Sequence, residues 1–417
     1  MIKKAGKTLK DLGNMRVFSP SDYYLMWAIF SISATLRLFK VTKPGVPFLD
    51  ETVVMSDVNT IMFGNLPIDE KPLFGRFLVF LQYYFLRNGD SVLNSSDFSN
   101  FPNFYLMRIV STVISSFVPC LVTASLLALK LSGFTAFMGG FLYCFDIGQI
   151  ILSKQISTEP LFLLFSSLCI FFSSYRKQKR KAIFAQLQVL CAIIALSIDD
   201  LGILMVIYCI FEYKTMPKGS ITKLISTAMF IKSFEIGLKA AFAPENHPLL
   251  PRMFHSYDLY EKCKIIIQVV ISKYSSLKSP ISRILYWPLM KLRPQIIWKS
   301  EESRFVVVNN LVGLLSISLA SFFGCFFFTE SYFFWLSIAF VWLLRPMKIS
   351  SYQIPFIFGI ISLSKGFNNF AKPIMMILSI CLCVIVVLNF VIYFVWAYGI
   401  PISPEFNRDI DIWTRGM

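Results

Sequence analysis

Long apolar segments recur from one end of the chain to the other, and they limit its possible folds more than any other feature. Most are close to the ~20 residues that an α-helix needs to cross a bilayer. Hydrophobic residues fill 56% of the 417 positions, against about 45–50% in soluble domains. The segments lie at roughly 23–39, 106–131, 133–152, 159–174, 182–198, 200–213, 221–242, 305–328, 330–345, 350–364 and 373–398. The sequence therefore predicts an all-α polytopic membrane protein with about eleven helices, and it excludes soluble, collagen-like and disordered classes.

Basic residues between the apolar segments predict the orientation of the chain. Five lysines and arginines precede the first segment without a signal-peptide cleavage site, so we expect a cytoplasmic N-terminus. The loops after the fourth, sixth and tenth segments are also basic, as the positive-inside rule requires of cytoplasmic loops. The predicted division is a cytoplasmic tail at 1–22, a transmembrane region of about seven helices at 23–242 with a polar loop at 40–102, a second polar loop at 243–304, about four helices at 305–399, and a tail at 400–417. Both polar loops and the last tail then face away from the cytoplasm.

The charge and the cysteine content narrow the kinds of partner. Lys and Arg outnumber Asp and Glu by 40 to 24. This excess fits the topology and contact with anionic lipids or phosphate ligands, whereas no basic stretch forms a soluble domain for nucleic acid. Eight of the nine cysteines lie in apolar segments, and His247 and His255 are the only histidines. The spacing contains no metal-ligand pattern, so we expect neither a metal nor a disulfide framework.

Ionisable residues gather beside the apolar segments on the non-cytoplasmic side. Asp50 and Glu51 follow the first segment, and Asp69-Glu70-Lys71-Pro72-Leu73-Phe74-Gly75-Arg76 precedes a further apolar stretch. Ordinary roles stay open for them: helix capping for the acidic pair, and an interfacial helix anchored by Arg76. The remaining candidates, at the ends of segments or between them, are Arg37, Arg108, Asp146, Glu159, Asp199 and Asp200. Snorkelling is the ordinary alternative for the two arginines. Because charges at membrane depth are expensive and these converge on one face, we expect a functional site there.

Carboxylates and arginines at one membrane face favour a particular chemistry. A lipid-linked sugar phosphate presents its phosphate at the interface, where arginines can hold it and stabilise it as a leaving group. A carboxylate can take the proton from an attacking hydroxyl, which is a weak nucleophile on its own. The sequence therefore indicates transfer of a sugar from a lipid phosphate.

Short motifs in order along the whole chain resemble protein O-mannosyltransferases, which are GT-C membrane glycosyltransferases. Arg37 and Asp50-Glu51 are similar to the family's arginine late in the first helix and its acidic pair in the next loop. The stretch 69–76 fits the family's Asp-x-His-Pro-Pro-Leu-Gly-Lys motif without a gap from that pair. Further likenesses are Tyr105-Leu106-Met107-Arg108, Phe145-Asp146, Ser153-Lys154, Glu159-Pro160-Leu161, Tyr286-Trp287-Pro288-Leu289 with Arg293-Pro294, Ser351-Tyr352-Gln353-Ile354-Pro355, and Tyr398-Gly399-Ile400-Pro401 with Trp413.

The resemblance implies inverting transfer of mannose from dolichyl-phosphate mannose to Ser/Thr hydroxyls of secretory proteins, at the lumenal face of the endoplasmic reticulum membrane. It implies Asp50 as general base, with Glu51 positioning the base or the sugar. Arg108, together with Arg37 or Arg76, would hold the donor phosphate. Substrate positioning is expected of Asp69, Lys71, Asp146 and Glu159, of which the last two are also expected to orient helices. The lipid-linked donor is the only small molecule implied, with no cofactor and no metal, and a homo- or heterodimer with a family member is expected.

The chain departs from the family pattern at several positions. Lys71 replaces a histidine, Glu159 an aspartate, Asp199 a lysine, and Ser350-Ser351 a pair of histidines. The loop 243–304 is too short for the β-trefoil MIR domain, so we expect a compact form. Three alternatives remain open: a non-catalytic partner of an active relative, a membrane transporter or lipid scramblase, and a transferase acting on a glycan or lipid acceptor.

Overall fold

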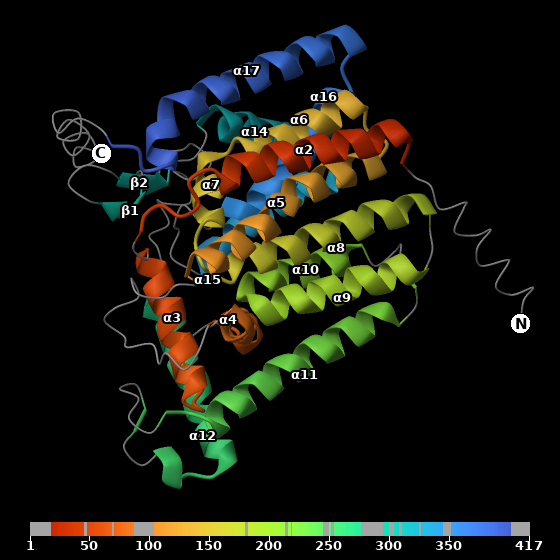
Figure 1. Ribbon diagram of the computed structural model, residues 1–417. Coiled ribbons are helices and arrows are strands. Elements are labelled where there is room, and N and C mark those ends of the chain that lie inside the picture. The colour runs from red at the N-terminus through yellow and green to blue at the C-terminus, as the bar shows by residue number, and fades with distance from the viewer. Residues whose placement is uncertain are drawn as a thin grey trace, which may run out of the picture.

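The computed structural model is a bundle of helices with two further groups of helices beside it and one small sheet (Figure 1). It describes residues 18–45, 48–68, 71–86, 104–179, 182–212, 216–217, 219–244, 250–251, 254–276, 295–299, 304–307, 311–324, 327–344 and 352–401. The predicted helical fold is confirmed. Its helices are α2 (Pro20–Leu38), α3 (Leu49–Met62), α4 (Leu73–Leu86), α5 (Phe104–Ala128), α6 (Gly133–Cys144), α7 (Ile147–Ser153), α8 (Glu159–Lys179), α9 (Ala182–Ile198), η2 (Asp200–Gly202), α10 (Ile203–Phe211), α11 (Ser220–Ala241), η4 (Phe254–Ser256), α12 (Leu259–Ser276), α14 (Leu311–Gly324), α15 (Thr329–Leu344), α16 (Gln353–Asn368) and α17 (Lys372–Ala397).

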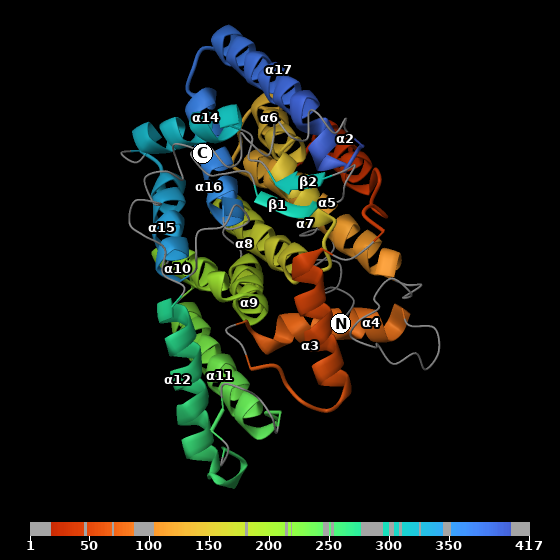
Figure 2. The ribbon, with the colours of Figure 1, turned by 90° about the vertical axis from the view of Figure 1, so that its left-hand side faces the viewer.

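The bundle is built in layers around buried helices. α5 packs against α2 and α8, and α8 packs against α9. α16 lies deep in the bundle and packs against α6, α14 and α15. Its residues from Gln353 to Ser364 are accordingly buried. α17 covers one edge and the pair α11 and α12 lies at the opposite edge (Figures 1 and 2). One large apolar core runs through these helices, and a smaller one joins α3 and α4 to the first turn of α5.

Local sequence explains where two of these helices begin. Ser19 and Asp22 form a capping box at the start of α2, with Pro20 at the first helical position. Asp146 accepts a hydrogen bond from the backbone N–H of Gln149 and so starts α7 anew after α6 has ended. α6 and α7 meet at a bend of 60°. The predicted apolar segment 133–152 is therefore two helices joined at a bend, because an N-capping aspartate interrupts it.

A two-stranded antiparallel sheet is an element that the sequence analysis did not predict. β1 (Gln295–Lys299) pairs with β2 (Arg304–Val307), with Gln295 opposite Val307 and Lys299 opposite Arg304. A helix over 305–328 is therefore wrong at its start, since Phe305, Val306 and Val307 are aromatic and β-branched residues that favour a strand. The motif Tyr286-Trp287-Pro288-Leu289 with Arg293-Pro294, in the second polar loop, lies outside the described residues.

The number of membrane spans remains a prediction. By length and composition, α5 and the range 372–395 of α17 can each cross a bilayer, among the residues that the structure describes. Two bent pairs raise this number to as many as four if each pair counts as one span: α6 with α7, and Ser316–Gly324 with Thr329–Ala339. Several other apolar helices, such as α9 and α10, are shorter than the ~20 residues of a straight span.

Candidate active site

The end of α2 and the starts of α3 and α5, which carry Arg37, the acidic pair and Arg108, lie at one end of the bundle, at the left of Figure 1. There the end of α2, the start of α3, the start of α5 and α7 come together with the small sheet. The best-defined contact joins two fully buried side chains, Glu51 and Arg108. Arg108 Nε donates to Glu51 Oε1 at 2.9 Å and Nη2 donates to Oε2 at 2.7 Å. This bidentate geometry is the strongest form of an arginine–carboxylate pair.

Glu51 is saturated by its contacts. Besides Arg108, Oε1 accepts from the backbone N–H of Ile156 at 2.9 Å, and Oε2 accepts from that of Phe48 at 2.8 Å. A carboxylate has about four lone-pair sites, so these four hydrogen bonds leave none for a substrate hydroxyl. The contacts therefore hold Glu51 firmly at the start of α3. Its predicted role, positioning the base or the sugar, stays a prediction.

Aromatic rings hold Arg108 in place. Its guanidinium lies 4.3 Å from the ring centroid of Phe104 and 4.8 Å from that of Phe48. Nη1 also donates to the carbonyl of Pro44 at 2.6 Å. Phe48 in turn meets Phe305 of β2 edge to face at 5.4 Å. Through Phe305, the sheet packs against Phe48, which in turn contacts Arg108. The sequence did not reveal this role of the sheet.

Asp50 occupies the second position of α3, one residue before the anchored Glu51. The first turn of a helix favours a negative charge, and the fixed start of α3 determines where the backbone of Asp50 lies. The structure describes that backbone and not the side chain, so the predicted general base stays a prediction. The same holds for Asp69, which lies outside the described residues.

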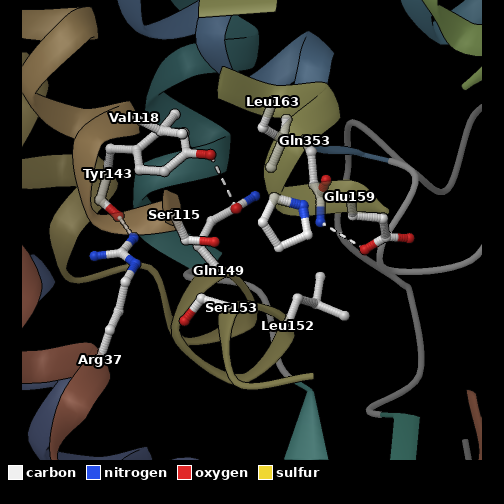
Figure 3. Close-up of a pocket in the computed structure, with 11 residues that line it drawn as sticks. Arg37, Ser115, Val118, Tyr143, Gln149, Leu152, Ser153, Glu159, Leu163 and Gln353 are labelled. Atoms are coloured by element: carbon white, nitrogen blue, oxygen red, sulfur yellow. Dashed lines mark hydrogen bonds between the residues drawn. The ribbon is translucent and has the colours of Figure 1, made fainter. Parts of the chain in front are cut away.

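Arg37 and Glu159 line one narrow cavity of about 10 Å³ (Figure 3). Arg37 is fully buried at the end of α2, where Nη1 donates to Ser33 Oγ at 2.5 Å and Nη2 to the carbonyl of Tyr143 at 3.4 Å. Across the cavity, Glu159 Oε2 accepts from Gln353 Nε2 at 3.3 Å. An arginine and a carboxylate that are 122 positions apart in sequence thus face the same space.

Two polar groups in the wall of this cavity lack hydrogen-bond partners. Arg37 Nε and Gln149 Nε2 are buried and have no hydrogen-bond partner within the described part of the chain. Both are N–H donors, and the cavity also has the hydroxyls of Ser115 and Ser153 in its wall. An unmade buried hydrogen bond is unfavourable by about 1–3 kcal/mol. A volume of about 10 Å³ has room for about one water molecule, so these donors favour a single acceptor atom, such as one oxygen of a phosphate or a sugar.

Asp146 lies beside the cavity and organises its wall. It is fully buried, caps α7 through the N–H of Gln149 at 2.9 Å, and accepts a hydrogen bond from the hydroxyl of Tyr352. Tyr143 donates to Gln149 Oε1 at 3.0 Å from the other side. These contacts orient α7 and join α16 to the first half of the chain, and the role of Asp146 in substrate positioning stays a prediction.

Lys154 is a functional candidate that the sequence analysis did not select. It is fully buried, its Nζ donates to the carbonyls of Phe39 at 3.0 Å and Ala397 at 3.5 Å, and it lies 3.9 Å from the ring centroid of Tyr398. No described carboxylate pairs with it. The signal was a lysine directly after the apolar stretch 147–153, which the rule for charges at membrane depth covers.

Arg76 and Lys71 have structural contacts of their own. Arg76 of α4 is buried and forms an ion pair with Asp57 of α3, and neither residue lines the cavity. The carbonyl of Lys71 accepts a hydrogen bond from Lys239 Nζ at 2.8 Å, which ties the start of α4 to α11. The predicted roles of Arg76 in phosphate binding and of Lys71 in substrate positioning stay predictions.

Comparison with known proteins identifies the fold. A family model described as dolichyl-phosphate-mannose-protein mannosyltransferase matches residues 28–216, just under half of the chain. The chain superposes on a subunit of the S. cerevisiae protein O-mannosyltransferase Pmt1-Pmt2 complex bound to the sugar donor with a TM-score of 0.69 at 10% identity, covering 96% of this chain and 93% of that one. ArnT from Cupriavidus metallidurans bound to undecaprenyl phosphate gives 0.50 at 11% identity, covering 84% and 60%. No sequence among curated proteins matches the chain.

The chain therefore has the GT-C fold of these two proteins. Within that class, the resemblance to protein O-mannosyltransferases that the motifs predict is confirmed, and the family model covers the region that carries Arg37, Asp50, Glu51 and Arg108.

Proposed function

We propose that the protein transfers mannose from dolichyl-phosphate mannose to Ser or Thr hydroxyls of secretory polypeptides. The observation that carries this proposal is the saturated Glu51–Arg108 pair, which fixes the first turn of α3 and with it Asp50. This turn lies at the same end of the bundle as the cavity of Arg37 and Glu159. The family model and the donor-bound yeast complex supply the substrate class.

The proposed reaction is a single displacement at the anomeric carbon. The acceptor oxygen forms a bond to that carbon while the bond from the carbon to the phosphate oxygen breaks, which inverts the configuration. The hydroxyl proton passes to the carboxylate of Asp50. The electron pair of the broken bond stays with dolichyl phosphate, which leaves as the anion. Glu51 takes no proton in this scheme, because its oxygens are occupied by Arg108 and two backbone amides.

Two buried cations are suited to the leaving phosphate. Arg37 bonds only the neutral acceptors Ser33 and Tyr143, and Lys154 bonds only backbone carbonyls, among the contacts of the described residues. A buried charge without a counter-ion is unfavourable, so an anionic ligand gains more here than at a saturated site. We assign the donor phosphate to Arg37 and Lys154, and we assign Arg108 to holding Glu51. This assignment differs from the expectation from the sequence, in which Arg108 also contacts the phosphate.

The remaining parts of the proposal follow from topology and from the relatives. We place the site on the lumenal side of the endoplasmic reticulum membrane, with the N-terminus in the cytoplasm and the C-terminus in the lumen. The yeast relative is a complex of two proteins, Pmt1 and Pmt2, and we propose a dimer with a family member for this chain as well. Arg37 and Lys154 supply the positive charge, so we propose a reaction without a metal.

The test is mannosyl transfer in a purified system. The full chain, with any partner that co-purifies, is given dolichyl-phosphate mannose carrying radiolabelled mannose and a Ser/Thr-rich peptide. We expect label on the peptide, unchanged transfer in EDTA, and a loss of about 10²-fold or more with Asp50→Asn, the scale of a lost general base. Glu261→Gln is the matched control, since this carboxylate is exposed on α12.

Each outcome of that assay decides a different point. Transfer that survives Asp50→Asn would remove Asp50 as the base. A loss in EDTA that is restored by a divalent cation would contradict the metal-free reaction. Absence of transfer, with every co-purifying partner present, would favour the non-catalytic partner subunit over the enzyme.

A further inference from the structure

The short connection from α7 to α8, residues 154–158, contacts both parts of the candidate active site. It begins with Lys154, which we assigned to the donor phosphate. Two residues later, the backbone N–H of Ile156 donates to Glu51 Oε1 at 2.9 Å. Ile156 is fully buried and belongs to the small apolar core that joins α3, α4 and α5. The connection therefore links the proposed phosphate site to the start of α3, which carries Asp50.

Two neutral side chains in this connection have hydrogen-bonding groups that are not satisfied. Gln155 is 2% exposed, and its Nε2 is buried without a hydrogen-bond partner among the described residues. The hydroxyl of Ser157 is buried and lacks a partner there as well. A buried donor without a partner is unfavourable, so both groups favour a ligand that supplies an oxygen. Because an amide and a hydroxyl carry no charge, they suit the hydroxyls of a sugar better than a phosphate, which prefers cations.

The geometry of the proposed reaction brings the sugar to this part of the chain. In a displacement with inversion, the base and the leaving group lie on opposite faces of the sugar ring. The ring therefore lies between the groups that bind the phosphate and the helix that carries the base. The connection has the same order, since Lys154 precedes Gln155, and Ile156, which holds the start of α3, follows it. The amide of Gln155 is thus carried between the two sides of the reaction.

We propose that Gln155 determines which sugar the protein accepts, by donating a hydrogen bond from its amide to one hydroxyl of the donor sugar. The proposal rests on the proposed function, because that function supplies a hexose between a phosphate and a base. A buried hydrogen-bonding group discriminates strongly against an analogue that lacks its partner. Gln155 therefore distinguishes sugars that differ at one hydroxyl, whereas Arg37 and Lys154 bind the phosphate that all such donors share.

Binding of deoxy donors tests this role without requiring catalysis. The full chain with its co-purifying partner, in phosphatidylcholine nanodiscs, is given dolichyl-phosphate mannose with a radiolabelled sugar. Unlabelled donors that lack the 2-, 3-, 4- or 6-hydroxyl in turn then compete with the labelled donor. We expect one of these deoxy donors to bind about tenfold more weakly than the mannose donor. Gln155→Met removes the amide at similar size and should bind the mannose donor and that deoxy donor equally.

The stability of the unliganded protein separates this role from a structural one. Because Gln155 Nε2 has no partner to lose among the described residues, Gln155→Met should leave the melting temperature unchanged or raise it. Gln188→Met is the matched control, since Gln188 is also buried but accepts from Arg176 Nε at 3.1 Å and donates to Cys209 Sγ at 3.5 Å. This control should lower the melting temperature and leave the preference between donors unchanged.

The outcomes distinguish a failure of this proposal from a failure of the proposed function. Equal binding of all deoxy donors by the unmodified protein, or a preference that persists in Gln155→Met, would overturn the role of Gln155. A lowered melting temperature with equally weakened binding of every donor would make Gln155 a structural residue and overturn it as well. Discrimination at one hydroxyl without transfer of mannose to a peptide would contradict only the proposed function. Absence of binding by every donor would contradict both.

Discussion

Glu51 and Arg108 carry opposite charges in a place where neither side chain reaches solvent. Removing one partner of a buried pair leaves the other uncompensated, which is unfavourable by about 3–5 kcal/mol. We expect Glu51→Gln to lower the unfolding free energy by about that amount, measured by denaturation in detergent micelles. The double change Glu51→Gln with Arg108→Met should be less destabilised than the sum of the single changes, since the two residues interact directly. Strict additivity would contradict the pairing.

Substitution of Arg37 tests whether this side chain holds the phosphate of the donor. Hydrogen bonds to charged groups contribute about 1.5–3 kcal/mol, so Arg37→Met should reduce kcat/KM for the donor about 10- to 100-fold. Arg37→Lys keeps the charge and should recover part of the loss. The same variants should leave KM for the acceptor peptide nearly unchanged. An effect confined to acceptor KM would place Arg37 with the polypeptide instead.

A substitution at Gly75 tests how closely α4 packs against Ile198 and Thr158. A methyl group there meets the backbone carbonyl of Ile198 at 2.7 Å, and a backbone atom cannot turn away as a flexible side chain can. We expect Gly75→Ala to destabilise the protein by about 1–3 kcal/mol, the usual effect of overpacking. Gly237→Ala is the matched control, because it also lies within a helix and has open space around it. That control should be neutral, or stabilising by up to about 1 kcal/mol.

The elements also show what the sequence could predict. Apolar segments predicted most of the helices. The topology inferred from the basic loops predicted that Arg37, Arg108, Asp146 and Glu159 lie at one face with the loop of Asp50. The pattern did not reveal the break before α7, since an aspartate inside an apolar stretch also fits a buried charge. Nor did it reveal Lys154, whose partners Phe39 and Ala397 are backbone groups from both ends of the chain. Such contacts depend on tertiary packing, which periodicity does not encode.

At the scale of the whole molecule, an ionic network fixes the end opposite the site. Glu330 of α15 pairs with Lys365 of α16 at 2.6 Å and with Lys177 of α8 at 3.7 Å, and Lys177 also pairs with Glu212 after α10 at 3.0 Å. Glu330→Gln should therefore lower the unfolding free energy by about 1–3 kcal/mol while donor KM stays unchanged. Thermal denaturation and transfer kinetics on one preparation would measure both. A changed donor KM would show that this end is coupled to the site.

The central claim is that the start of α3 and the end of α2 meet around the head group of a lipid-linked phosphosugar. Electron cryo-microscopy of the full chain with its partner and dolichyl-phosphate mannose tests it most directly. The account predicts the donor phosphate within about 2.7–3.2 Å of Arg37, with Asp50 facing the anomeric carbon and the Glu51–Arg108 pair intact. A head group bound at another end of the bundle, or Asp50 directed away from the sugar, would contradict it.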